Sequence, residues 1–152
     1  MKMTVNDAIL RYNLIAAMKF IDGDYSISRD LKIKLIRYKI DLEKVKNDFV
    51  AFQEKAMEEI KTEEYKTLFN KENKTEEESQ KLVEIANGLN EELGKLISNK
   101  TMETVNVKSF EFLTEDEFNE ILSVNIENSP LINSNQLDAN TYVELIHNVF
   151  VK

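Results

Sequence analysis

The sequence predicts a mainly α fold: a long antiparallel helical hairpin or bundle, with a minor β element and C-terminal helices. Two observations lead to this prediction. The stretch from Leu31 to Ile60 contains no glycine and no proline, and its apolar residues recur every three or four positions. One stretch, near residue 105, alternates as a β-strand does. We expect a single domain over residues 1–152, because this is an ordinary domain length and no long linker interrupts it.

The first helix is expected over residues 4–20, where apolar residues follow a plausible N-cap at helical spacing. The sequence DGDYS at residues 22–26 ends this pattern with a turn. Its alternating acidic residues are like the start of an EF-hand loop. However, Ile27 stands where such a loop needs glycine, and Ile33 where it needs a bidentate acid. We therefore predict a turn without calcium.

The second helix is expected over residues 28–61, with Ser28 as its N-cap. At 1.5 Å per residue it would span roughly 50 Å, which exceeds the diameter of a compact domain of this size. Part of it must therefore pack on another long helix or project outward. Its distal half, which contains Phe49 and Phe52, has the narrow apolar seam of a coiled coil.

Residues 62–74 are expected to form the tip of the hairpin, and a third helix is expected over residues 75–98. The sequence TEEE matches a capping box at the start of that helix. Gly88 and Gly94 interrupt it, each at a cost of ~1 kcal/mol relative to alanine. Close approach to the second helix is one reason to accept that cost. We expect the two long helices to pack antiparallel.

A strand is expected over residues 101–110, and helices over residues 114–124 and 138–151. The strand needs a hydrogen-bonding partner. Residues 25–27 are one candidate partner, and another molecule is a second. The remaining alternative is that this segment is only an extended connector. Thr114 matches an N-cap with a second capping box.

The charge is acidic overall, with a formal net value of −8, and it is unevenly distributed. Residues 29–46 carry seven basic and three acidic side chains, whereas residues 54–92 carry six basic and twelve acidic ones. Either the two regions neutralise each other or form solvated faces, or the basic region docks an acidic partner. The acidic balance argues against direct binding of nucleic acid. No apolar run is long enough for a membrane span, and no secretory signal is expected at the N-terminus.

The sequence also argues against an enzyme. It has no cysteine, one histidine, no glycine-rich phosphate loop and no nucleophile motif. Glu144 and His147 form the Glu-x-x-His pattern of di-iron bundles, but a second histidine is lacking, so we expect a surface or partly buried histidine. The acidic residues 115–117 follow an N-cap, where they stabilise a helix. We therefore predict no catalytic residue, no cofactor and no metal.

The chain resembles a family of small uncharacterised proteins encoded by tailed bacteriophages over about residues 4–122. The resemblance is carried by the order of elements: TVNDAILRYNLIAA, the long helix, a polar tip, LNEELGKLI, the strand-like TVNVKSF and LTEDEFNEIL. The acidic stretch 72–84 and residues 123–152 depart from the pattern. The resemblance implies a phage origin and a non-enzymatic role, in the host cytoplasm or the virion.

We therefore expect a phage protein that acts by protein–protein interaction, as a virion, tail-associated or assembly component. A phage-encoded inhibitor of a host defence protein is the alternative. The partner is expected to be another protein or a second copy of the chain. Candidate partner-binding residues are Arg29, Lys32, Arg37, Lys39, Lys46, Phe49, Phe52, Tyr142 and Phe150.

Overall fold

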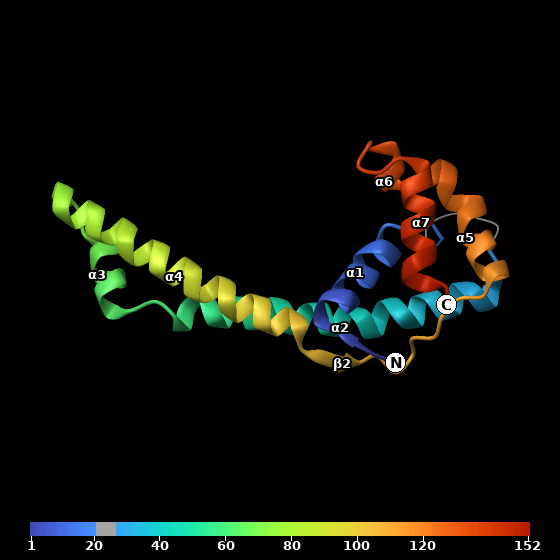
Figure 1. The fold of residues 1–152 in the computed structure, drawn as a ribbon, viewed down its shortest axis with the longest axis horizontal. Helices are drawn as coiled ribbons and strands as arrows, with labels where there is room; N and C mark the ends of the chain where they lie inside the picture. Colours follow the sequence, from blue (N-terminus) through green and yellow to red (C-terminus); the bar gives the residue numbers. More distant parts are fainter. Residues whose placement is uncertain (21–26) are drawn as a thin grey trace. The chain divides into compact units, whose positions relative to one another are not determined.

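The computed structural model describes residues 1–20 and 27–152, and it is mainly α-helical with a small antiparallel sheet (Figure 1). This confirms the predicted fold class. The described chain divides into two compact units, residues 1–46 with 104–152 and residues 47–103. The boundary falls inside one long helix, so a single domain over the whole chain stays a prediction. The turn expected over residues 22–26 lies outside the described residues.

The elements of the first unit are β1 (Lys2–Thr4), α1 (Val5–Ala16), the first part of α2 (Arg29–Glu59), β2 (Thr104–Asn106), α5 (Glu115–Asn128), α6 (Pro130–Asn133) and α7 (Ala139–Phe150). The second unit contains the rest of α2, α3 (Glu63–Asn70) and α4 (Glu76–Met102). The helix predicted over residues 28–61 is therefore α2, and the helix predicted over residues 75–98 is α4.

Side-chain caps explain where most of these helices begin. Thr75 and Thr114 each accept a hydrogen bond from the N–H of the glutamate three residues later, and each glutamate reaches back to the N-cap N–H. Thr4 forms a third capping box, with Asp7, which the sequence analysis had not identified. Asp138 caps α7 through the N–H of Thr141. These short motifs set the helix starts locally.

The predicted strand over residues 101–110 is wrong in its extent. Residues 101 and 102 continue α4, and β2 covers only Thr104–Asn106. Its partner is β1, with Met3 opposite Val105 in an antiparallel register. The terminal amino group of Met1 extends this pairing by donating to the carbonyl of Val107 over 2.7 Å. The partner of this strand within the chain is thus the N-terminal segment, which was not among the predicted candidates.

Other predicted boundaries also differ from the structure. The helix predicted over residues 4–20 ends at Ala16. The tip predicted over residues 62–74 contains α3, which starts at an N-cap threonine, Thr62. The helix predicted over residues 114–124 continues to Asn128, and its added turn includes the fully buried Asn125. The helix predicted over residues 138–151 is α7, one residue shorter at each end.

The core of the first unit gathers aromatic and aliphatic side chains from α1, α2, α5, α7 and the 107–113 segment. Tyr38 of α2 packs on Phe110, with ring centroids 5.0 Å apart, and Phe110 packs on Phe150 at 6.2 Å. The N–H of Leu113 donates to the carbonyl of Phe150 over 2.7 Å, which fixes the end of α7. In this unit α7 lies beside α5 (Figure 1).

This core corrects two predicted partner-binding residues. Tyr142 is 1% exposed and Phe150 is fully buried. Both lie on the inner face of α7, so neither side chain is at the surface. The high apolar content of the last helix has a simpler explanation: it docks firmly in its own unit.

Candidate functional site

The second unit is an antiparallel helical hairpin. The ammonium group of Lys100 in α4 lies 5.3 Å from the ring centroid of Phe52 in α2. Further along, Ala56 and Leu96 line one small hollow, and Ile60 and Leu89 line another. Residue numbers rise along α2 while those of their neighbours fall along α4. The side-chain contacts thus give the predicted antiparallel pairing.

The hairpin has almost no buried core. Ala56, 6% exposed, is the one buried side chain among residues 47–103, all of which the structure describes. No side chain of α3 or α4 is buried. Several large apolar side chains are instead well exposed, including Met57 at 48%, Phe69 at 60% and Val83 at 58%. Each long helix covers the apolar side chains of the other from one side only, so the second side of the seam faces solvent.

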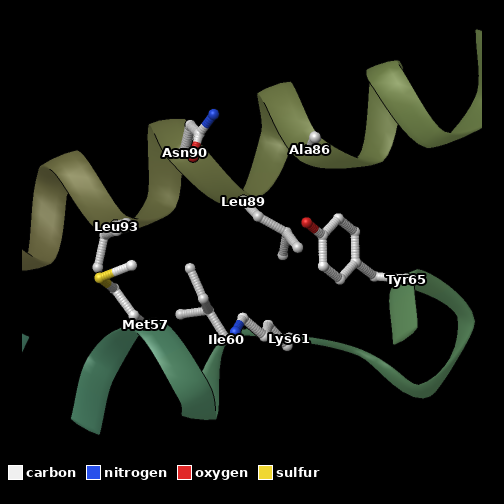
Figure 2. A pocket seen from close by; sticks show the side chains of 8 residues that line it. All are labelled: Met57, Ile60, Lys61, Tyr65, Ala86, Leu89, Asn90 and Leu93. Atoms are coloured by element: carbon white, nitrogen blue, oxygen red, sulfur yellow. The ribbon is translucent and has the colours of Figure 1, made fainter. Parts of the chain in front are cut away.

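A hollow of about 160 Å³ opens where α2 ends. Figure 2 shows Met57 of α2, and Ile60 just after its end, meeting Leu89 and Leu93 of α4, with the ring of Tyr65 beside them. Tyr65 belongs to α3, and its ring stacks on that of Phe69 with centroids 5.7 Å apart. The apolar surface of the hollow therefore continues from the seam onto α3 through this aromatic pair.

The two sides of the seam differ in charge. On the side of this hollow, α4 presents uncharged residues at intervals of four and three: Ser79, Val83, Ala86, Asn90, Gly94, Ile97 and Thr101. On the same side, α2 presents Val50, Gln53 and Met57. We call these ten residues the uncharged face. The other side is rimmed by charges, such as the Lys55–Glu59 ion pair of 3.6 Å.

The sequence analysis had missed the uncharged face. The prediction rested on the strongest apolar seam, which runs through Phe49 and Phe52, and not on the charge of the neighbouring positions. The spacing of uncharged residues along α4 was the available signal. Both predicted phenylalanines are half-buried in the structure, at or near the seam.

The structure does not support the prediction that the two glycines of α4 permit a close approach of α2. A Cβ atom added to either Gly88 or Gly94 would meet nothing within 4 Å. Neither glycine is therefore required by a close approach of α2. Gly94 lies on the uncharged face, whereas Gly88, six residues earlier, lies on the charged side of the helix.

The first unit has a groove of its own, with a volume of about 490 Å³. Cationic Arg37 and Lys108 line it together with Ile33, which is exposed. Lys34 also lines the groove, but its ammonium group is held by Glu117, 2.8 Å away. Asp30 and Glu111 also line the groove, so it combines apolar surface with charges of both signs, and it places one predicted partner-binding residue, Arg37, in a defined hollow.

The structure does not gather the other predicted basic residues around Arg37. Lys32, Lys39 and Lys46 recur every seven residues along α2, and Arg37 lies about 140° around the helix from Lys32. The ammonium group of Lys46 sits 4.4 Å from the ring centroid of Tyr12. Arg29 is exposed in the first turn. The basic segment therefore forms separate faces rather than one patch.

His147 is half-buried at the surface of the first unit. Its Nε2 atom lies 3.1 Å from a carboxylate oxygen of Glu115, and its ring meets that of Phe118 edge-on. Within residues 1–20 and 27–152, no group of three or more acidic or histidine side chains is arranged to hold a metal ion. The histidine side chain therefore joins α7 to α5.

Comparison with protein-family models, with curated proteins and with solved structures gives no match to this chain. Among the described helices, none combines the length and the apolar content that crossing a membrane requires.

Proposed function

We propose that this protein acts without catalysis, by protein–protein interaction, and that the hairpin of residues 47–103 is its interaction element. One observation supports this most directly: Ala56 is the only buried side chain of that unit. Helices in proteins are stabilised chiefly by burying an apolar face. A hairpin that leaves its apolar residues exposed is suited to a partner that covers them.

Within that class, we favour a structural or assembly component of a bacteriophage, as the resemblance of residues 4–122 implies. Two long capped helices form a rigid element, and rigid helical surfaces are what assembly contacts commonly use. The distribution of large apolar side chains agrees with this role. Those that are exposed in the hairpin lie along α2 and α4 and at Phe69 of α3, and are not gathered in a small enclosed cavity.

An inhibitor of a host defence protein is the second candidate, and the groove of the first unit favours it. Arg37 and Lys108 could pair with carboxylates of a bound segment, while Ile33 contacts its apolar side chains. This mode would use the first unit and leave the hairpin free. The two candidates therefore predict different contact residues.

A site-specific cross-linking experiment in phage-infected cells tests the proposal. A photoreactive amino acid is placed at Val83, on the uncharged face, or at Arg37, in the groove. Glu92, which is exposed nine residues later and therefore on the opposite side of α4 from Val83, is the matched control position. Cross-linked products are identified by mass spectrometry, and purified particles are analysed for the chain itself.

A structural or assembly role predicts cross-links from position 83 to a particle or assembly protein or to a second copy of the chain, with few from position 92. Cross-links from position 37 to a host protein, with none from position 83, would favour the inhibitor. An absence of cross-links from both positions, in a folded protein, would contradict an interaction role for either surface.

A further inference from the structure

The hairpin's own helices leave the uncharged face open to solvent. It carries three well-exposed apolar side chains, Val50, Met57 and Val83, and the hollow beside Tyr65 continues it. The unit that holds it is strongly acidic, with fourteen acidic and eight basic residues. Yet none of the ten residues of the face is charged. Charge is thus confined to the edges of this surface, where Lys61, Glu76 and Glu84 lie.

We infer that the uncharged face binds the same face of a second copy of this chain, so that two hairpins form a four-helix arrangement. This inference rests on the proposed function and names the partner of the hairpin. In a dimer of this kind, each copy presents the same patch to the other across a two-fold axis. Each hairpin would then gain the missing layer of its core.

The size of the face suits a weak, reversible dimer contact. It extends about 33 Å along α4, from Ser79 to Thr101, and about 10 Å along α2, from Val50 to Met57. With helices about 10 Å wide, each copy offers on the order of 400 Å², which is at the low end of the area that transient interfaces bury. Met57 and Val83 are its most exposed apolar side chains.

The chemistry of the face suits an identical partner better than a different one. Its longest polar side chains are the amides of Gln53 and Asn90, and an amide group carries both donors and acceptors. Two copies of the same amide can therefore pair with each other, as asparagines do in the cores of coiled coils, where they fix the register. The face offers no charge by which an acidic or basic protein would be recognised.

The acidic residues around the face determine how added salt should affect the association of two copies. Two hairpins that each carry a net charge of −6 repel each other, and the repulsion is reduced as salt shortens the screening length. An apolar contact between them is not weakened by added salt. We therefore expect association to be unchanged or tighter at high salt, whereas a contact made by ion pairs would dissociate.

The glycines of α4 provide a matched pair of variants. An arginine at position 94 or at position 88 meets open space in the single chain, and both changes replace glycine by a good helix former. The two variants have the same composition and net charge. Only G94R places a guanidinium group on the uncharged face, where a dimer would bury two such groups without partners.

Light scattering after size exclusion, over a series of protein and salt concentrations, gives the mass of each variant. We expect the natural sequence and G88R to reach twice the chain mass of 17.7 kDa. We expect the dissociation constant of G94R to be raised roughly a hundredfold or more, with unchanged helix content by circular dichroism. If G94R fails to fold, Val83→Arg replaces it, because that side chain is already exposed.

A monomer for the natural sequence at all concentrations would overturn the inference, as would a dimer that high salt dissociates. Equal masses for G94R and G88R would also overturn it, because the contact would then lie elsewhere. These failures are separate from a failure of the proposed function. A monomer that still cross-links from position 83 to a different assembly protein keeps the interaction role and loses only the second copy.

Discussion

The hydroxyl group of Tyr38 makes two hydrogen bonds to the backbone of Glu111. It donates to the carbonyl over 2.6 Å and accepts from the N–H over 3.1 Å. The side chain of Tyr38 is 1% exposed, and its burial raises the pKa of the hydroxyl above its ordinary value. One α2 side chain therefore satisfies both polar backbone groups of a residue in the loop that joins β2 to α5.

Replacing Tyr38 by phenylalanine should destabilise the first unit by about 1–3 kcal/mol, because it leaves two backbone groups without partners near the core. Urea unfolding followed by circular dichroism measures the change. Y12F is the matched control, since the Tyr12 hydroxyl makes one 3.2 Å bond to a carboxylate of Glu43, in a more accessible place. Equal losses for the two variants would contradict the role given to Tyr38.

Asn125 of α5 binds the segment that follows α1. Its side chain is fully buried, accepts from the N–H of Lys19 over 2.8 Å and donates to the carbonyl of Ile121 over 3.0 Å. We expect N125A to cost about 2 kcal/mol, since the N–H of Lys19 loses its acceptor. Asn128 makes the same bond to the residue four earlier, over 2.7 Å, and provides the control. A thermal unfolding midpoint of N125A no lower than that of N128A would refute this.

Lys34 and Glu117 join α2 to α5 through a pair of hydrogen bonds of 2.8 and 3.1 Å. Burial alone would raise the pKa of Glu117, but the bonds from Lys34 and from the N–H of Thr114 outweigh it, so that pKa lies below its ordinary value of 4.5. A lowered carboxyl pKa stabilises the native state at pH values above the unfolded pKa. This contribution is lost as the pH falls through the folded pKa.

E117Q should therefore be less stable than the natural sequence by about 1 kcal/mol at neutral pH, and the difference should vanish in acid. Glutamine still fits the capping box, so the change removes the charge and keeps the cap. D116N, in the same turn, controls for a lost charge near the helix N-terminus. Denaturant unfolding at neutral and at acidic pH makes the comparison. A loss for E117Q that does not change with pH would show that the ion pair is not its cause.

The shortage of buried side chains in the hairpin predicts uneven protection of its amides. We expect the amides of α4 to exchange with solvent through a lower-energy opening than those of α7, because Tyr142, Ile146 and Phe150 anchor α7 in a core. Native-state hydrogen exchange, analysed by mass spectrometry, measures both helices in one sample. Protection of α4 that equals that of α7 in dilute, monomeric protein would contradict this. If the hairpins associate, protection of α4 should rise with protein concentration while that of α7 stays constant.

Local signals in the sequence predicted several elements correctly. The uninterrupted apolar period of α2 and the capping boxes at Thr75 and Thr114 act within a few residues, so they can be read without a fold. The strand at Thr104 was less predictable. Its partner, β1, lies a hundred residues earlier and is only three residues long, too short to show an alternating pattern. The function and the phage origin remain predictions.

By itself, the sequence determined that the protein is mainly helical, that it contains a long helix paired antiparallel with another, and that it is acidic with a basic segment near residue 37. Only the tertiary structure decided which apolar residues are buried. Tyr142 and Phe150 have the same periodicity as an exposed binding stripe, but they are buried in the core of the first unit, where α5 and α6 contact α7 and Phe110 packs on Phe150. Met57 and Val83 are exposed because the hairpin has only two long helices to share one seam. Periodicity identifies a face that needs a partner, and the arrangement of the other elements decides whether that partner lies within the chain.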